Sequence, residues 1–283
     1  MTFFYPETVK HVEKSSWERG DKAWSESSIR NPVQDDTLNQ AIIAEAGVKP
    51  GNHVLDIASG TGNPAVSAAL LLRDSGSITL TDLSRGKLEI SQIRASSFNR
   101  KKLNYCCADM TNLPFADETF DVAMCRFGIM FVKNKVKAAR EAMRVLKFGS
   151  NITYMVWDAY HKNPPFFIPS KVISEFFGEK EAAIPARHSM CAPGLLKSVM
   201  EQAGYTNISE RQIKYKNRVI NLKRYIANGL KRSHKDRIKG LTKSDLTKLK
   251  KLIFQAWSPY ENNGATKIPN CARICTGSKP AST

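Results

Sequence analysis

Short apolar segments alternate with helical segments between residues 33 and 157, and this alternation limits the possible folds more than any other feature. Segments 53–58 (HVLDIA) and 120–125 (FDVAMC) are apolar almost throughout, as expected of strands buried on both faces of a parallel sheet. Segment 135–146 instead spaces its apolar residues as a helix does. The pattern predicts a doubly wound, Rossmann-like α/β sheet.

The individual elements follow from the same reasoning. Strands are expected at 53–58, 77–81, 103–108, 120–125 and 151–157, with helices at 33–47, 64–73, 86–97 and 135–146. After residue 157 the alternation is less regular. There we expect helices at 166–177 and 193–203, a strand at 205–215, two or three helices within 221–259 and a last strand at 271–276.

The segment 54–65 (VLDIASGTGNPA) joins the first strand to a helix through a tight turn. Glycine at Gly60 and Gly62 allows the backbone to approach a ligand, and the helix N-terminus supplies free N–H donors. Three interpretations compete. In the first, the turn needs glycine only for its shape. In the second, it binds a nicotinamide dinucleotide, since Asp82 lies 20 residues after Gly62, where a ribose-binding acid is expected. In the third, it binds S-adenosylmethionine.

Three acidic residues favour S-adenosylmethionine. Asp56 lies just before the turn, where a carboxylate suits an ammonium group and would repel a pyrophosphate. Asp82 closes the second strand and can accept hydrogen bonds from both ribose hydroxyls, whereas Asp109 ends the third strand and can accept one from an adenine amine. Because parallel strands end at the same edge of a sheet, we expect all three to face one ligand.

Residues 54–158 resemble the class I S-adenosylmethionine-dependent methyltransferases, most of all the small-molecule branch that includes the ubiquinone/menaquinone-biosynthesis C-methyltransferases. The matching segments are VLDIASGTG, LTDLS, ADMTNLPFADETFDVAMCRFGIMF and REAMRVLKFG. The resemblance implies methyl transfer to a small organic acceptor at an O, N or C atom, and a seven-stranded sheet with an antiparallel last strand. It also implies that the late insertion caps the acceptor pocket.

The domain organisation that follows is a single methyltransferase domain over residues 1–283. Its core is expected at about 33–158, 188–215 and 268–283, after an N-terminal arm at 1–32. Helical lid insertions are expected at about 159–187 and 216–266.

The resemblance further implies which residues contact S-adenosylmethionine. Those expected at the methionine and ribose are Asp56, Ala58, Ser59, Gly60, Gly62, Asp82 and Arg126, and those expected at the adenine are Leu83, Asp109 and Met110. Ala58 stands where the family usually has its first glycine, which narrows the loop slightly. The segment 148–150 (FGS) replaces the usual Pro-Gly-Gly turn. Neither change removes a polar group that the cofactor needs.

Candidates for the acceptor pocket follow the fourth and fifth strands. Phe127, Met130 and Trp157 are candidate substrate contacts, although such residues are as often part of a core. His161 is the candidate catalytic base because imidazole titrates in the useful range, although a loop histidine is more often solvated. The six cysteines lack paired metal-ligand spacing, so no metal site is expected, and the acceptor itself is not identified.

Positive charge is concentrated late in the chain. The sequence holds 43 Lys and Arg against 26 Asp and Glu, a net charge of +17, and the segment 211–251 alone contributes +13. A solvated helical face is the ordinary explanation. The functional explanations are that the positive charge attracts an anionic acceptor, an anionic membrane surface or RNA.

Aromatic residues are sparse in this basic segment, with Tyr215 and Tyr225 present, which counts against stacking on single-stranded RNA. An acidic small molecule or a substrate at a membrane surface is therefore favoured. The alternatives from other classes are an NAD(P)-dependent oxidoreductase and a basic RNA-interacting or RNA-modifying protein on a methyltransferase scaffold. The sequence has neither a long apolar run nor a recognisable signal segment, so we expect a cytoplasmic protein.

Overall fold

The computed structural model describes residues 37–72, 75–96, 102–180, 184–262 and 265–282, so the expected arm at 1–32 lies outside the described residues. The chain forms two compact units. The first unit comprises Met1–Val156, Ala192–Arg211 and Arg273–Thr283, and the second comprises Trp157–Cys191 and Gln212–Ala272. The role of the second unit as a lid stays a prediction.

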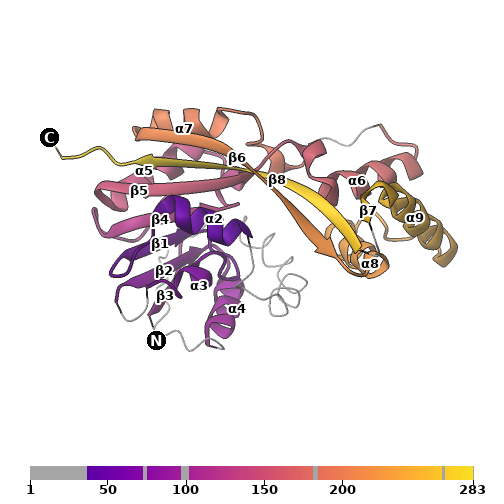
Figure 1. The fold of residues 1–283 in the computed structure, drawn as a ribbon, viewed down its shortest axis with the longest axis horizontal. Helices are drawn as coiled ribbons and strands as arrows, with labels where there is room; N and C mark the ends of the chain where they lie inside the picture. The colour runs from indigo at the N-terminus through magenta and orange to yellow at the C-terminus, as the bar shows by residue number, and fades with distance from the viewer. Residues whose placement is uncertain (1–36, 73–74, 97–101, 181–183, 263–264, 283) are drawn as a thin grey trace. The chain divides into compact units, whose positions relative to one another are not determined.

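The described strands form one sheet in the order β3-β2-β1-β4-β5-β8-β6, with the short β7 paired to β8 outside this order (Figure 1). The strands are β1 (His53–Ile57), β2 (Ser77–Asp82), β3 (Leu103–Cys107), β4 (Phe120–Arg126), β5 (Leu146–Trp157), β6 (Thr206–Val219), β7 (Glu261–Asn262) and β8 (Ala265–Ser278). The pairs from β3 through β5 are all parallel. The predicted doubly wound sheet is confirmed.

Strand β8 runs antiparallel to β5. The side chain of Ser278 bonds Asn151, whereas Thr276 bonds Thr153, so residue numbers fall along β8 as they rise along β5. This orientation confirms the expected antiparallel last strand.

Helices of the first unit lie in two layers against the sheet (Figure 1). One layer contains α2 (Thr37–Ala46), α3 (Ala65–Ala68) and α4 (Arg85–Ser96), and the other contains α5 (Lys135–Val145) and α7 (Leu195–Ala203). The core between the layers is apolar, and Val54, Leu55 and Ala123 on the central strands have no exposed surface. A short 3₁₀ turn, η1 (Ile129–Phe131), follows β4.

Four elements differ from the prediction by more than two residues within the described part of the chain. Helix α3 is a single turn, because the N–H groups of Leu70 and Leu71 bond carbonyls three residues back and the α-helix tightens there. Strand β5 begins at Leu146 rather than at 151, with an irregularity in its pairing to β4. Strands β6 and β8 extend well beyond their predicted ends, since local sequence pattern does not report cross-strand pairing.

Helices of the second unit are α6 (Pro164–Phe176), α8 (Leu222–Ser233) and α9 (Lys243–Ala256), with the 3₁₀ turns η2 (Tyr160–Lys162), η3 (Ala186–His188) and η4 (Ser258–Tyr260). Their core includes Leu249, Ile253 and Trp257, which have no exposed surface. Helices α8 and α9 confirm the prediction of two or three helices within 221–259. Within the described residues, no helix is long and apolar enough to cross a membrane.

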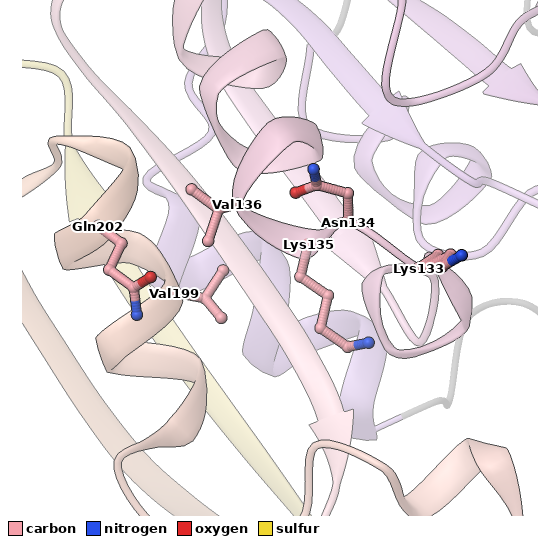
Figure 2. A pocket seen from close by; sticks show the side chains of 6 residues that line it. All are labelled: Lys133, Asn134, Lys135, Val136, Val199 and Gln202. Atoms are coloured by element: carbon pink, nitrogen blue, oxygen red, sulfur yellow. The ribbon is translucent and has the colours of Figure 1, made fainter.

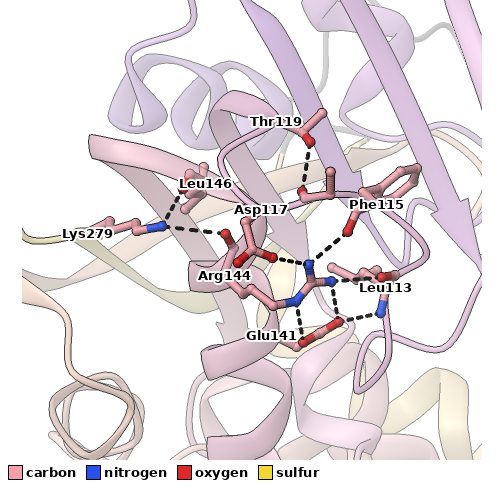
Figure 3. A network of polar contacts seen from close by, with 9 residues as sticks. Leu113, Phe115, Asp117, Thr119, Glu141, Arg144, Leu146 and Lys279 are labelled. Carbon is pink, nitrogen blue, oxygen red and sulfur yellow. Dashed lines mark hydrogen bonds and ion pairs between the residues drawn. The ribbon is translucent and has the colours of Figure 1, made fainter. Parts of the chain in front are cut away.

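A network around Arg144 of α5 fixes the loop between β3 and β4 (Figure 3). The guanidinium donates to the carbonyls of Leu113 and Phe115 and pairs with Glu141 and Asp117. These pairs raise the pKa of Arg144 further, so the group is charged at any working pH. The network therefore holds the backbone at Leu113 and Phe115, shortly after Asp109 and Met110 in the chain.

Candidate functional site

Three carboxylates lie at neighbouring strand ends in the first unit, as predicted. Asp56 is on β1, Asp82 is the last residue of β2, and Asp109 follows β3 by two residues. The parallel register pairs Asp82 with Cys107 on β3, and Ile57 with Thr81 on β2. The structure therefore gathers the three residues at the carboxyl-terminal edge of one sheet.

The carboxyl group of Asp56 is fully buried and only half satisfied. Its Oδ2 accepts a hydrogen bond from the N–H of Ala65 at 3.1 Å, whereas Oδ1 has no partner among the described residues. Burial raises the pKa of Asp56 to about 8, against the lowering effects of the Ala65 N–H and of the nearby Arg126. A buried acceptor of this kind favours a cationic donor group.

The glycine loop, residues 58–64, has open space at Gly60. Gly60 has φ +55°, and a Cβ built there would meet nothing within 4 Å. The nearby Ser59 hydroxyl is buried without a partner among the described residues. By contrast, a Cβ on Gly62 would lie 2.5 Å from the hydroxyl oxygen of Ser91 on α4, so Gly62 serves close packing of the loop against that helix.

Ala58 fits in the loop because a glycine, Gly128, packs against it. Its φ is +56°, a left-handed conformation that costs an alanine roughly 1–2 kcal/mol. A Cβ on Gly128 would lie only 2.5 Å from the Ala58 Cβ, so the missing side chain at Gly128 makes room for the extra methyl group. The departure from the family pattern at Ala58 is thus accommodated sterically.

Asp82 organises the loop beneath it. One carboxylate oxygen accepts from the N–H of Gly60 at 3.0 Å and the other from the N–H of Ser84 at 2.9 Å. Asp109 is arranged differently: its Oδ1 accepts from the N–H and the hydroxyl of Thr111, and its Oδ2 has no partner among the described residues. Leu83 and Met110 follow these two acids directly and are half-buried.

Two polar residues that the sequence analysis missed hold this edge together. Asn39 of α2 is fully buried and accepts from the guanidinium of Arg126 at 2.6 Å. Arg94 of α4 is nearly buried and donates to the carbonyl of Thr61 at 2.5 Å. No local motif marks either residue, because each acts on a segment distant in sequence.

The acceptor candidates fall in different units. Phe127 and Met130 follow β4 in the first unit, and Phe127 has an unusual positive φ of 61°. Trp157 belongs to the second unit, where its ring lies 5.1 Å from that of Phe166. His161 is also in the second unit, on η2, and its side chain is exposed. The roles of the four candidates at the acceptor stay predictions.

Another histidine in the second unit is arranged very differently. His188 is 1% exposed, its Nδ1 lies 2.8 Å from the carbonyl oxygen of Asp158, and its Nε2 is buried without a partner among the described residues. Burial is the largest cause that lowers the pKa of His188, to about 4. The sequence offered no signal for it, since it lies in an irregular segment.

A pocket of about 580 Å³ lies elsewhere in the first unit, between the start of α5 and α7 (Figure 2). Two polar side chains that line it bond the backbone at the N-terminus of α5. Lys135 donates to the Val132 carbonyl, and the Asn134 side chain accepts from the N–H of Lys137. None of the predicted site residues lines it. Within the described residues, no cluster of three or more His, Cys, Asp or Glu could hold a metal ion.

Fold and site together define the class. A parallel sheet with an antiparallel last strand carries a glycine loop and three strand-end carboxylates, as in Rossmann-like methyltransferases. The ubiE/COQ5 methyltransferase family matches residues 8–167, which is more than half of the chain. The chain belongs to this family, which confirms the resemblance found in the sequence.

Relatives agree with the family assignment. A Ubiquinone/menaquinone biosynthesis C-methyltransferase UbiE of Ralstonia pickettii is 30% identical over 178 residues, covering 59% of this chain and 72% of the relative. An uncharacterised protein of Mycobacterium tuberculosis is 33% identical over 151 residues, covering 53% of this chain. The chain spans about half, 52%, of the length of that mycobacterial relative.

Solved structures share the fold at low identity. Phosphoethanolamine N-methyltransferase 2 of Haemonchus contortus, in complex with S-adenosyl-L-methionine, matches with a TM-score of 0.60 and 17% identity, covering 98% of this chain and 61% of that one. A SAM dependent methyltransferase from Aquifex aeolicus matches with a TM-score of 0.51 and 16% identity, covering 68% of this chain and 92% of that one. These matches support the fold.

The nicotinamide alternative is not favoured. A pyrophosphate needs the free N–H groups of a helix N-terminus, whereas here the buried Asp56 carboxylate accepts from Ala65 at the start of α3. The helix itself is only one turn long, which weakens its dipole.

Proposed function

We propose that this protein transfers a methyl group from S-adenosylmethionine to a small organic molecule. The observation that carries the proposal is the buried Oδ1 of Asp56, which has no described partner, together with the open space at Gly60 in the loop that follows. A cationic ammonium group satisfies such an oxygen, and the cofactor's methionine part carries one. When bound, the cofactor supplies an electrophilic methyl on a sulfonium ion.

The other strand-end residues suit the remaining parts of the cofactor. Asp82 is fixed by two backbone N–H groups, so its carboxylate is held ready to accept from ribose hydroxyls. Asp109 has its Oδ2 available for an adenine amine, and the half-buried apolar residues Leu83 and Met110 directly follow Asp82 and Asp109. Fixed acceptors cost little reorganisation on binding, which favours affinity.

The methionine end of the site is assigned to Arg126 and the loop residues Ala58 and Ser59. Arg126 is held by Asn39 and contributes positive charge near Asp56. The Ser59 hydroxyl is a second buried group that a ligand can satisfy. Gly62 is assigned an indirect role, since its close contact with Ser91 sets the shape of the loop.

We expect S-adenosylhomocysteine to bind the wild-type protein and NADH not to bind. Asp82→Ala should weaken S-adenosylhomocysteine binding by ~1.5–3 kcal/mol, the scale for hydrogen bonds to a charged group. Isothermal titration calorimetry measures both ligands on both proteins.

The matched control is Asp121→Ala. Asp121 accepts from the N–H of His53 at 2.7 Å, at the opposite edge of the sheet, so its loss removes a similar bond without touching the site. Equal affinity of the Asp82→Ala and Asp121→Ala proteins for S-adenosylhomocysteine would contradict the assignment. Tight NADH binding would support the oxidoreductase instead.

We further propose that the methyl acceptor is acidic or lies at an anionic membrane surface. Lys214, Lys216 and Arg218 occupy alternate positions of β6, and all three are exposed. Alternate residues of a strand share one face, so this part of the second unit presents a row of positive charge. Such a row raises the local concentration of anions. The role of the exposed His161 as a base stays a prediction.

Neutralising this row by Lys214→Gln, Lys216→Gln and Arg218→Gln should raise the apparent KM for acidic acceptors several-fold. The change should shrink at high salt, because the Debye length falls from ~8 Å at 0.15 M to ~3 Å at 1 M. Turnover is measured as S-adenosylhomocysteine formed with a panel of acidic and neutral small molecules.

The control variant neutralises three exposed lysines of the first unit, Lys49, Lys133 and Lys137. It should leave the KM unchanged, and both variants should keep wild-type cofactor affinity. Binding to vesicles of phosphatidylglycerol, which is anionic, is compared with binding to vesicles of phosphatidylcholine, which has no net charge, to test whether the row contacts an anionic membrane surface. If the triple variant at Lys214, Lys216 and Arg218 loses tRNA binding but keeps the wild-type KM for every acceptor, the result would instead support RNA as the partner.

A further inference from the structure

Asn39 of α2 joins three other segments of the first unit through one buried amide. Its Oδ1 accepts a hydrogen bond from the guanidinium of Arg126 at 2.6 Å, at the end of β4. Its Nδ2 donates to the side chain of Asn63 in the glycine loop at 3.1 Å and to the hydroxyl of Ser67 in α3 at 3.0 Å. Because a guanidinium only donates, the amide oxygen must face Arg126, which fixes the orientation of the Asn39 amide.

The guanidinium of Arg126 is held on a second side by an aromatic ring. Its central carbon lies 5.3 Å from the ring centroid of Phe127, which is a cation–π arrangement. The backbone at Phe127 is itself tied to the sheet, since its N–H donates to the carbonyl of Met155 at 2.8 Å. Arg126 is only half-buried, so part of its surface is open to a ligand. A long, flexible side chain is thus restrained while staying accessible.

The restrained guanidinium lies near the buried carboxyl group of Asp56. Strands β1 and β4 pair with Asp56 opposite Met124, so Arg126 lies two residues further along the neighbouring strand. Burial is the largest effect on the pKa of Asp56 and raises it, whereas the positive charge of Arg126 lowers it. The site therefore places an acidic and a cationic group on adjacent strands.

This pair matches the amino-acid end of S-adenosylmethionine, which carries an ammonium group and a carboxylate on the same carbon. Asp56 suits the ammonium group, as proposed above. A guanidinium suits the carboxylate, because its N–H donors lie in one plane and match the two carboxylate oxygens. Since one N–H group of Arg126 is bonded to Asn39, the directions of its other N–H groups depend on Asn39.

We propose that Asn39 is a positioning residue, which holds Arg126 as the partner of the cofactor's carboxylate and so makes the site select an intact amino-acid end. The inference rests on the proposed function and adds the residues that recognise this group. A donor that is held in place before binding loses little freedom when the ligand arrives. Without Asn39 the ligand itself has to order the guanidinium, so the preference for the carboxylate should fall.

S-adenosylhomocysteine and its decarboxylated analogue, S-adenosyl-3-thiopropylamine, are the probes, because they differ in the carboxylate alone. We expect the wild-type protein to bind S-adenosylhomocysteine at least about tenfold more tightly than the analogue, a difference of ~1.4 kcal/mol. Arg126→Gln should abolish this preference because it removes the cation. Both ligands carry an ammonium group, so effects on Asp56 cancel in the ratio of the two affinities. Isothermal titration calorimetry measures each affinity.

A double-mutant cycle tests whether Asn39 acts through Arg126. Asn39→Leu, which has a similar size and no polar group, should lower the preference for S-adenosylhomocysteine at least about threefold. Adding Asn39→Leu to Arg126→Gln should cause no further change, because the preference is already lost. The matched control is Ser67→Ala, which removes another hydrogen bond of the same amide and leaves the bond to Arg126. It should keep the wild-type preference.

5′-Methylthioadenosine lacks the whole amino-acid end and serves as the control for folding. Every folded variant should bind it as the wild type does. Asn39→Ser provides a second variant if Asn39→Leu does not fold, because it removes the amide oxygen and keeps a polar side chain in the buried position. It should show the same loss of preference.

Three results would overturn the inference. They are equal affinity of the wild type for S-adenosylhomocysteine and its decarboxylated analogue, a full preference in a folded Asn39 variant, and effects of Asn39→Leu and Arg126→Gln that add. Additive effects would mean that Asn39 acts independently of Arg126. A wild-type protein that binds neither S-adenosylhomocysteine nor 5′-methylthioadenosine would instead contradict the proposed function, and this inference with it.

Discussion

Gly60→Val should abolish measurable binding of S-adenosylhomocysteine, with affinity reduced at least about a hundredfold, or ~2.7 kcal/mol. Gly60 has φ +55° and open space where a side chain would project, and that space is where the proposal puts the methionine part of the cofactor. A β-branched side chain fills it and is also poorly suited to a left-handed backbone. Calorimetry with S-adenosylhomocysteine measures the effect.

Gly149→Val is the matched control. Gly149 lies in β5, has φ +74° and likewise has nothing within 4 Å of a built Cβ. Both substitutions impose backbone strain, so both should lower the melting temperature, but only Gly60→Val should remove binding. If Gly60→Val bound S-adenosylhomocysteine like the wild type, the glycine loop would not be the cofactor site.

Asp56→Asn should weaken S-adenosylhomocysteine binding by ~1.5–3 kcal/mol while making the ligand-free protein more stable at pH 8. The amide keeps an acceptor for the N–H of Ala65 but cannot neutralise an ammonium group. Because burial raises the pKa of Asp56 from 3.8 to about 8, the folded protein favours the uncharged carboxyl group. The neutral amide avoids the cost of burying a charge.

The sign of the pH dependence follows from linkage. A raised pKa in the folded state means that the contribution of Asp56 to stability is fully present below about pH 4 and is lost as the pH rises towards 8. The melting temperature of Asp56→Asn should therefore exceed that of the wild type at pH 8 by several degrees, at ~2–4 °C per kcal/mol. At pH 4 the difference should vanish.

Thermal unfolding from pH 4 to 8, with and without S-adenosylhomocysteine, provides the measurement. Asp109→Asn serves as the control, because it makes the same substitution at a strand-end carboxylate that is only half-buried. A melting-temperature difference between Asp56→Asn and the wild type that stays constant with pH would show that Asp56 is charged in the folded protein.

The sequence predicted those features of the site that depend on neighbouring residues alone. The strand-end positions of Asp56, Asp82 and Asp109 could be predicted because parallel strands end at one edge and the strands themselves are plainly apolar. The length of α3 could not, since its Leu-rich continuation looks helical although its hydrogen bonds tighten to a 3₁₀ pattern.

Contacts between distant segments account for the other misses. Asn39 and Arg126 are 87 positions apart, and nothing near either residue indicates the bond between them. His188 lies 30 positions from the carbonyl that orients it, whereas His161 drew attention only by following a strand. The compensation of Ala58 by Gly128 likewise depends on two loops meeting in space.

Strands β6 and β8 each run through fourteen residues and contribute to both compact units. On β8 the pairing with the β5 segment keeps one register across the unit boundary, from Thr153 with Thr276 to Asp158 with Cys271. Because a one-residue slip turns every side chain to the other face, a one-residue deletion near Ala272 would leave the strand on one side of it in register and turn the side chains on the other side to the wrong face.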